Sequence, residues 1–243
     1  MASLPPGKCC TEGYLHSGTP LGTTIKCDDD FDLYIAKPKE DPTKCILYLS
    51  DIFGIPFLNH KILSDNFAKQ GFLTLLPNLF YDDPAPYPPT NTFVMPDWLK
   101  AHGPEVTEPI IEKTIAYCKA NFPSVSAFYA VGYCYGAKYV VRLLGAGTIL
   151  AGYIAHPSLV TAEELKAIKN PLSIAAAETD HIFTVEKRHE SEAILLDMKA
   201  TYYIAIYSQC VHGFAVRGDP NNEISKWSHE AAFWQAVTWF TRF

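Results

Sequence analysis

The stretch AVGYCYGAKY, residues 130–139, decides the fold because it joins an apolar strand to a helix through a tight turn. Cys134 lies at its centre, with Gly132 and Gly136 two positions away on either side. This spacing is typical of a nucleophile elbow, where the strand and helix backbones approach too closely for bulky flanking residues. The turn also places Cys134 at a helix N-terminus, which favours a thiolate. We therefore interpret Cys134 as a nucleophile, and the alternative is a small buried thiol that fills a gap.

Short apolar runs alternate with longer amphipathic runs on both sides of this turn. Strands are expected at 44–50, 72–78, 126–132, 148–156, 171–177 and 201–207, preceded by a hairpin at 23–36. Helices are expected at 59–71, 105–122, 135–145, 161–168, 185–199 and 223–243. This alternation predicts the α/β class, with a mostly parallel, doubly wound sheet of about eight strands and helices on both faces.

One segment departs from the alternation. Residues 81–104 carry six prolines, and this density predicts a long loop or lid that contains no regular element. No linker or internal repeat is visible elsewhere, so we expect residues 1–243 to form a single domain.

A cysteine nucleophile needs a base, and the base needs a group that orients it. In a parallel sheet, ligands bind beyond the carboxyl ends of the strands. Asp180 follows the strand predicted at 171–177, and His212 follows the last predicted strand. Cys134, Asp180 and His212 therefore appear in the chain order nucleophile, acid, histidine, each beyond the end of its own strand.

Other residues compete for these roles. Glu178 is closer to its strand end and is the alternative acid, whereas His181 is expected to point elsewhere. His156 also ends a strand, and we interpret it as pocket wall or as a hydrogen-bonded polar residue rather than as the base. The remaining histidines are expected to be exposed to solvent: His16, His60, His102, His189 and His229.

The composition limits the classes of function. A formal net charge of −6 and the lack of a basic tract argue against a nucleic-acid partner. No apolar run approaches the ~18 residues of a membrane helix, and no secretory signal begins the chain. The count of seven cysteines is odd and fits a reducing, cytoplasmic location better than a disulfide framework. Cys9 and Cys10 have no histidine or second cysteine pair nearby in sequence, so we expect no metal and no cofactor. A monomer and a homodimer are equally compatible with the sequence.

Five stretches carry a resemblance to a known family: SDIFGI (50–55), LPNLFYDDP (76–84), GYCYG (132–136), ETDH (178–181) and HGFAVRGD (212–219). They are distributed over most of the chain. With them the chain resembles the dienelactone hydrolase, or carboxymethylenebutenolidase-like, family of α/β-hydrolases, and especially its fungal-type members.

That resemblance implies an enzyme that cleaves a carboxylic ester or lactone through an acyl-enzyme. It implies that Cys134 is the nucleophile, His212 the general base and Asp180 its orienting partner. It further implies an oxyanion hole formed by the backbone N–H groups of Ile52 and Tyr135. The expected partner is a small-molecule ester or lactone.

Two differences from the bacterial members concern the substrate. Those members have a glutamate that holds the resting thiol, where this chain has the shorter Asp51. They also bind the dienelactone carboxylate with two arginines; Arg217 resembles one, and the region of the other contains aspartates here. These differences leave open whether dienelactone itself is a substrate. Aromatic side chains that include Phe53 and Tyr81 are expected to line the pocket, although most aromatic residues of the chain would fill the core.

A second class of function remains open at this point. The chain could be a non-catalytic scaffold that binds a ligand or senses redox state through Cys134. Within enzymes, a thioesterase or a carbon–carbon hydrolase would use the same three residues, because one fold serves many chemistries.

Overall fold

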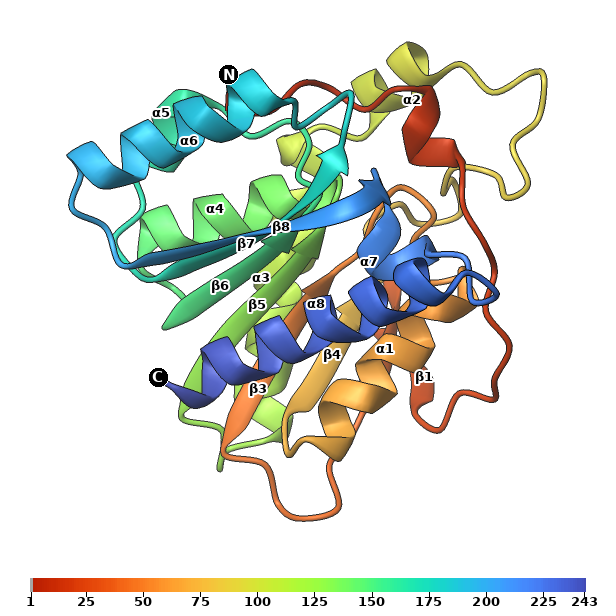
Figure 1. Cartoon of the computed structure of the whole chain (residues 1–243). Coiled ribbons are helices and arrows are strands. Elements are labelled where there is room, and N and C mark those ends of the chain that lie inside the picture. Colours follow the sequence, from red (N-terminus) through yellow and green to blue (C-terminus); the bar gives the residue numbers. More distant parts are fainter. Residues whose placement is uncertain (1) are drawn as a thin grey trace. The chain divides into compact units, whose positions relative to one another are not determined.

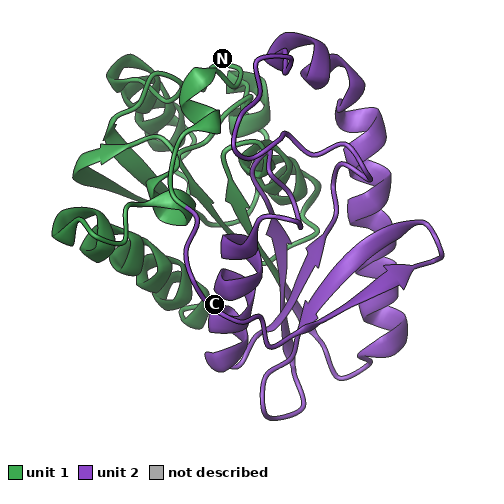
Figure 2. Cartoon of the chain, turned by 90° about the vertical axis from the view of Figure 1, so that its right-hand side faces the viewer, with its two compact units in different colours: residues 1–14, 129–243 green, residues 15–128 purple. Residues whose placement is uncertain are grey.

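The computed structural model describes residues 2–243, which form two compact units (Figure 2). Unit 1 combines the N-terminal segment up to Tyr14 with residues 129–243, and unit 2 comprises residues 15–128. The eight predicted strands all form, and most pairings between them are parallel. The α/β class with a mostly parallel sheet is therefore confirmed.

Unit 2 begins with the predicted hairpin of β1 (Thr23–Cys27) and β2 (Phe31–Ala36), which pair antiparallel. Asp28 and Asp29 form its turn in the left-handed region, with φ of 51° and 55°, which short polar side chains tolerate. β2 pairs antiparallel with β4 (Leu73–Pro77), and β4 pairs parallel with β3 (Lys44–Leu49). β3 and β4 read as nearly continuous apolar runs because both of their faces are covered.

Two long helices of unit 2 pack against this sheet: α1 (Leu58–Lys69) contacts β4 and β2, and α3 (Pro104–Asn121) contacts β4 and β1. The prediction that residues 81–104 contain no regular element was wrong, because α2 (Met95–Ala101) forms there. Pro96 lies in the first turn of α2, where a backbone N–H has no partner within the helix and its loss has little effect.

Unit 1, which begins again at Tyr129 within β5, carries four parallel strands in the order β5-β6-β7-β8: β5 (Ala127–Tyr133), β6 (Ala151–Ala155), β7 (Leu172–Thr179) and β8 (Tyr202–Val211). Figure 1 shows α4 (Gly136–Ala146) and α6 (Val185–Asp197) on one face of these strands and α8 (Glu223–Thr241) on the other. The short α5 (Ala162–Lys166) begins with a capping box formed by Thr161 and Glu164. A one-turn helix that the sequence did not predict, α7 (Phe214–Arg217), follows β8.

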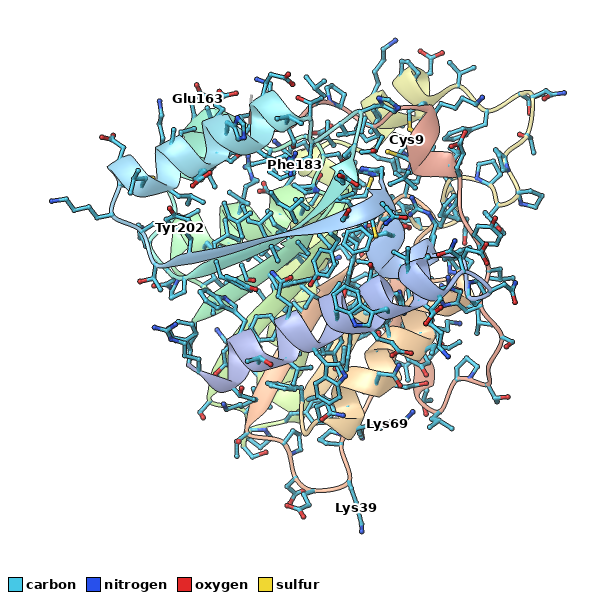
Figure 3. All side chains as sticks on the ribbon, in the orientation of Figure 1. Cys9, Lys39, Lys69, Glu163, Phe183 and Tyr202 are labelled. Atoms are coloured by element: carbon cyan, nitrogen blue, oxygen red, sulfur yellow. The ribbon has the colours of Figure 1, made fainter. Side chains whose placement is uncertain are left out.

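The N-terminal segment of unit 1 is tied to the carboxyl ends of these strands. The N–H of Ser3 donates to the carbonyl of Val160, and the N–H of Leu4 donates to that of Ile182. A 3-10 turn, η1 (Lys8–Thr11), follows, and Figure 3 labels Cys9 on it. The N–H of Tyr14 then donates to the carbonyl of Arg217. Backbone hydrogen bonds on both sides of η1 therefore hold it at the strand ends.

Candidate active site

The elbow at Cys134 is built from close packing of β5 against α4. A Cβ atom added to Gly132 would lie 2.7 Å from the carbonyl oxygen of Gly136 and 2.8 Å from the Cα of Ala137. Cys134 itself has a φ of 50°, in the left-handed region that a non-glycine residue rarely adopts. Glycine at 132 is thus required by the backbone approach, and the turn directs Cys134 into the protein, where it is fully buried.

Asp180 and His212 meet beyond the ends of β7 and β8. The His212 Nδ1 atom lies 2.9 Å from Asp180 Oδ2 and 3.1 Å from Oδ1. Asp180 Oδ1 also accepts the backbone N–H groups of Ile182, at 2.8 Å, and Phe183, at 3.0 Å. These bonds fix the carboxylate, and the carboxylate in turn fixes the orientation of the imidazole.

Glu178, the alternative acid, is occupied elsewhere. Its carboxylate accepts hydrogen bonds from the Ser208 hydroxyl, at 3.1 Å, and from the backbone N–H of Gln209. This contact spans an irregularity in the β7–β8 pairing, where Gln209 has a φ of 59°. Glu178 is exposed, so the geometry brings Asp180 rather than Glu178 to the histidine.

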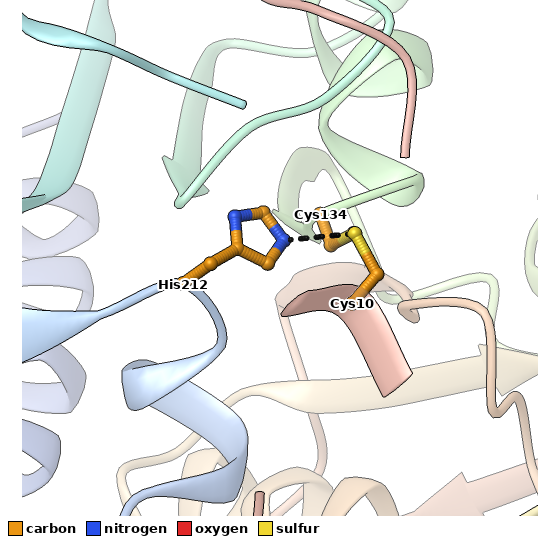
Figure 4. Close-up of side chains that lie close together, drawn as sticks. All are labelled: Cys10, Cys134 and His212. Atoms are coloured by element: carbon orange, nitrogen blue, oxygen red, sulfur yellow. Dashed lines mark hydrogen bonds between the residues drawn. The ribbon is translucent and has the colours of Figure 1, made fainter. Parts of the chain in front are cut away.

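A residue not predicted from sequence lies between the nucleophile and the base. The Cys10 Sγ atom is 3.4 Å from His212 Nε2 and 3.5 Å from Cys134 Sγ. Figure 4 shows the three side chains side by side, with the contact from His212 drawn to Cys10. One side-chain sulfur or nitrogen atom from each of the three lies within 4.8 Å of the other two, and all three residues are buried.

The charges of the site favour a thiolate at Cys134. Burial opposes ionisation, but the hydrogen bond from Cys10 and the charges of His212 and Arg217 outweigh it and hold the pKa of Cys134 well below its usual range. Burial likewise opposes the imidazolium form, yet the Cys134 thiolate and the Asp180 carboxylate raise the pKa of His212. The His212 contact and two backbone donors lower the pKa of Asp180 to about 2 despite its burial. These pKa directions favour a thiolate at Cys134 and an imidazolium at His212, with the Asp180 carboxylate beside it.

Two further residues flank this pair. The ring of His156 stands edge-on to the ring of His212 at a centroid distance of 5.0 Å and is fully buried. His156 therefore forms part of the wall around His212. The Ser158 hydroxyl lies 3.5 Å from Cys134 Sγ, and the Ser158 N–H donates to the Cys134 carbonyl.

Arg217 is buried beside a cavity of about 500 Å³ in unit 1. Its Nε atom donates to the backbone carbonyl of Glu12 at 2.9 Å, so the side chain anchors the N-terminal segment. Among the residues that line this cavity are Cys9, Tyr14, His181, His212 and Arg217. His212 can therefore be approached from the cavity. A larger cavity of about 1020 Å³ lies in unit 2 and includes none of the residues around Cys134.

The remaining predicted residues, Ile52, Asp51, Phe53 and Tyr81, belong to unit 2. Asp51 Oδ1 accepts the Phe53 N–H at 3.0 Å and lies 2.7 Å from His60 Nε2, and His60 Nδ1 is 3.0 Å from the Tyr48 hydroxyl. The Asp51 carboxylate thus takes part in a buried network of its own unit. Phe53 is buried, whereas Tyr81 is exposed and has a φ of 51°.

Buried histidines correct one sequence prediction. His60 and His102 were expected to be exposed, but both are buried. His60 pairs with Asp51, and His102 Nδ1 lies 2.7 Å from the Trp98 carbonyl. His60 lies on α1, which was predicted, whereas His102 is the C-cap residue of α2, which was not. The partners that make the burial of both rings possible were not visible in the sequence.

Several known proteins are similar to this chain in sequence. A family model described as the dienelactone hydrolase family matches residues 31–243. A protein named hydrolase pyvD from Aspergillus violaceofuscus is 43% identical over 100% of this chain and 99% of its own length. Hydrolase tropI from Talaromyces stipitatus is 42% identical, covering 100% and 98%. Dienlactone hydrolase 1 from Gibberella moniliformis is 30% identical, covering 97% and 93%.

Solved structures support the fold. A dienelactone hydrolase from Anabaena variabilis superposes with a TM-score of 0.66 at 12% identity, covering 94% of this chain and 99% of that one. A dienelactone hydrolase-like promiscuous phosphotriesterase from metagenomic libraries superposes with a TM-score of 0.69 at 13% identity, covering 91% and 96%. Across residues 2–243, none of the helices is both long and apolar enough to cross a membrane.

Proposed function

Because the chain belongs to the dienelactone hydrolase family of α/β-hydrolases, and is thus a hydrolase of ester or lactone bonds, we propose that it works through an acyl-enzyme on Cys134. His212 is the general acid and base, and Asp180 orients it. The observation that carries this proposal is the buried Asp180–His212 pair beside a thiol at a strained strand-to-helix turn.

Acylation begins from the thiolate–imidazolium pair. The Cys134 thiolate attacks the ester or lactone carbonyl and forms a tetrahedral oxyanion. The N–H of Tyr135, at the N-cap of α4, is the proposed donor to that oxyanion, because the first N–H groups of a helix have no partner within it. Collapse expels the alcohol oxygen, which takes the proton from the His212 imidazolium. The assignment of Ile52 as the second donor stays a prediction.

Deacylation uses the same imidazole in its neutral form. A water molecule attacks the thioester carbonyl while His212 Nε2 accepts its proton. Collapse then releases the carboxylic acid and regenerates the Cys134 thiolate next to the imidazolium. Asp180 stabilises that imidazolium in both halves of the cycle through its contact with Nδ1.

The site also limits the substrate. A cavity of about 500 Å³ is of a size that holds a small molecule. A thiolate expels alkoxides of low basicity most readily, so strained lactones and aryl or enol esters fit the chemistry, whereas amides do not. Arg217 supplies one buried positive charge near His212 for an anionic group. We therefore propose an activated ester or lactone as the substrate.

Replacing the nucleophile tests the proposal. Cys134→Ala is expected to lower kcat for p-nitrophenyl acetate by a factor on the order of 10⁴ or more, because deletion of a nucleophile leaves only binding and oxyanion stabilisation. Cys27→Ala, at another buried cysteine but in unit 2, is the matched control and should retain activity. Turnover by Cys134→Ala at the wild-type rate would instead favour a non-catalytic role for this thiol.

A further inference from the structure

The group formed by Cys10, Cys134 and His212 has the donor atoms of a metal site. We propose that these three residues bind a thiophilic divalent ion, Zn²⁺ foremost, and that the bound ion holds the hydrolase in an inactive state. Metal binding stands on the geometry alone, whereas the inactivation also rests on the proposed function.

The distances suit tetrahedral coordination. Zinc bonds of about 2.3 Å to sulfur and about 2.0–2.1 Å to imidazole nitrogen place neighbouring ligand atoms about 3.5 to 3.8 Å apart. The Cys10 sulfur lies 3.5 Å from the Cys134 sulfur and 3.4 Å from His212 Nε2. The third separation, between Cys134 and His212, is no more than 4.8 Å. An ion at the centre of this triangle would need only small movements of the side chains.

The surroundings of His212 favour ligation through Nε2. Histidines that bind metal almost always donate their other ring N–H to a carboxylate or carbonyl, which fixes the tautomer and makes the ligand more basic. Asp180 holds His212 Nδ1 at 2.9 Å. Metal binding would displace the Nε2 proton, and Nε2 would then offer its lone pair toward the two sulfur atoms while Asp180 keeps the proton on Nδ1 (Figure 4).

The second thiol is held in place by the backbone. Leu4 on one side of η1 bonds to Ile182, and Tyr14 on the other side bonds to Arg217. Cys10 is fully buried between these anchors, whereas its neighbour Cys9 is only partly buried. No sequence spacing indicates this site, because Cys10 lies 124 positions from Cys134 and 202 positions from His212.

Two thiolates, one imidazole and one open position form a recurring zinc donor set. His212 lines the cavity of about 500 Å³, so a water molecule can reach the fourth position from there. An ion bound in this way coordinates both the Cys134 sulfur, which must attack the substrate, and His212 Nε2, which must transfer protons. Hydrolysis by the proposed mechanism is then blocked until the ion leaves.

The test compares two adjacent cysteines in the full chain, prepared metal-free and kept reduced with a phosphine. Zn²⁺ affinity is measured by competition with a chromophoric chelator, and Co²⁺ is used as a spectroscopic probe. Wild type is expected to bind one ion per chain and, with Co²⁺, to show thiolate-to-cobalt charge-transfer absorption. It should lose esterase activity when Zn²⁺ is added and regain it with EDTA. Cys10→Ser should weaken Zn²⁺ binding more than about a hundredfold, because loss of a residue that merely hydrogen-bonds to a metal ligand already costs about 10- to 100-fold in affinity. Cys9→Ser should change the Zn²⁺ affinity little.

Each remaining result decides the proposal. Equal Zn²⁺ affinity in Cys10→Ser and Cys9→Ser, or wild-type cobalt spectra without thiolate bands, would overturn the metal site. If Cys10→Ser does not fold, Cys134→Ser must weaken the thiolate bands of the cobalt spectrum, and unchanged bands would overturn the site. If wild type binds zinc through two sulfurs but Cys134→Ala keeps full esterase activity, the proposed function is contradicted and the metal site is supported.

Discussion

At the scale of single residues, the site depends on how charge is distributed over buried groups. Cys134 is fully buried, which by itself would keep its thiol protonated. The contact from Cys10 and the charge of His212 reverse this and lower the pKa of Cys134. His212 can remain charged because Asp180 lies against its other nitrogen. The charges of these three residues are therefore coupled, and removal of the Asp180 carboxylate should raise the pKa of Cys134.

Alkylation across pH measures that coupling. A thiol with a lowered pKa stays ionised as the pH falls, so the rate of Cys134 carboxamidomethylation should change little between about pH 9 and pH 6, whereas an ordinary thiol with a pKa near 8.5 loses reactivity over this range. Iodoacetamide labelling in EDTA, followed by peptide mass spectrometry of Cys134, gives the profile. Asp180→Asn should move the midpoint to higher pH.

Glu178→Gln serves as the matched control for that variant. Glu178 lies at the same end of β7 but bonds to Ser208 and Gln209, so its neutralisation should leave the Cys134 profile unchanged. An equal shift in both variants would contradict the assignment of Asp180 as the specific partner of His212.

At the scale of elements, the close approach of β5 and α4 positions the nucleophile. A side chain at residue 132 would meet backbone atoms of Gly136 and Ala137, which cannot rotate away as a flexible side chain can. Gly145 lies in the same helix, but a Cβ atom there has its nearest neighbour at an ordinary 3.5 Å. Substitutions at Gly132 and Gly145 therefore distinguish the close packing that the elbow requires from the general effect of replacing a glycine near α4.

Alanine substitutions at the two positions should therefore act in opposite directions. Gly132→Ala is expected to destabilise the protein by about 1–3 kcal/mol, the usual penalty for overpacking, and to lower esterase activity by displacing Cys134. Gly145→Ala is expected to be neutral or to stabilise by up to about 1 kcal/mol, because alanine favours a helix interior. Urea denaturation gives both free energies of unfolding, and equal stability of the two variants would contradict this view of the elbow.

At the scale of the whole molecule, the sequence predicted most of the regular elements and part of the site. The alternation of apolar and amphipathic runs located all eight strands, because each strand is bounded by turns or by a helix of different period. The positions of Cys134, Asp180 and His212 were predicted from the rule that ligands bind at the carboxyl ends of parallel strands, and their roles from the chain order nucleophile, acid, histidine. These predictions use local patterns, which the sequence contains.

Features that depend on irregular backbone were missed. Cys10 reaches Cys134 and His212 through an N-terminal segment without periodic structure, so no spacing in the sequence relates the three. The network around Asp51 likewise joins a turn residue to His60 on α1 and to Tyr48 on β3. Helix α2 was not predicted because six prolines in residues 81–104 indicate a loop. Pro96, however, lies in the first turn of the helix, where proline is tolerated.

The most direct measurement of the central claim is the mass of the protein during turnover. His212→Asn should retain the elbow but lack the base for deacylation, so p-nitrophenyl acetate is expected to add one acetyl group per chain. Peptide mass spectrometry should locate that acetyl group on Cys134 and not on Cys10, whose sulfur lies only 3.5 Å away. An acetyl group on Cys10, or a protein that turns over ester while Cys134 never carries acyl, would contradict the account.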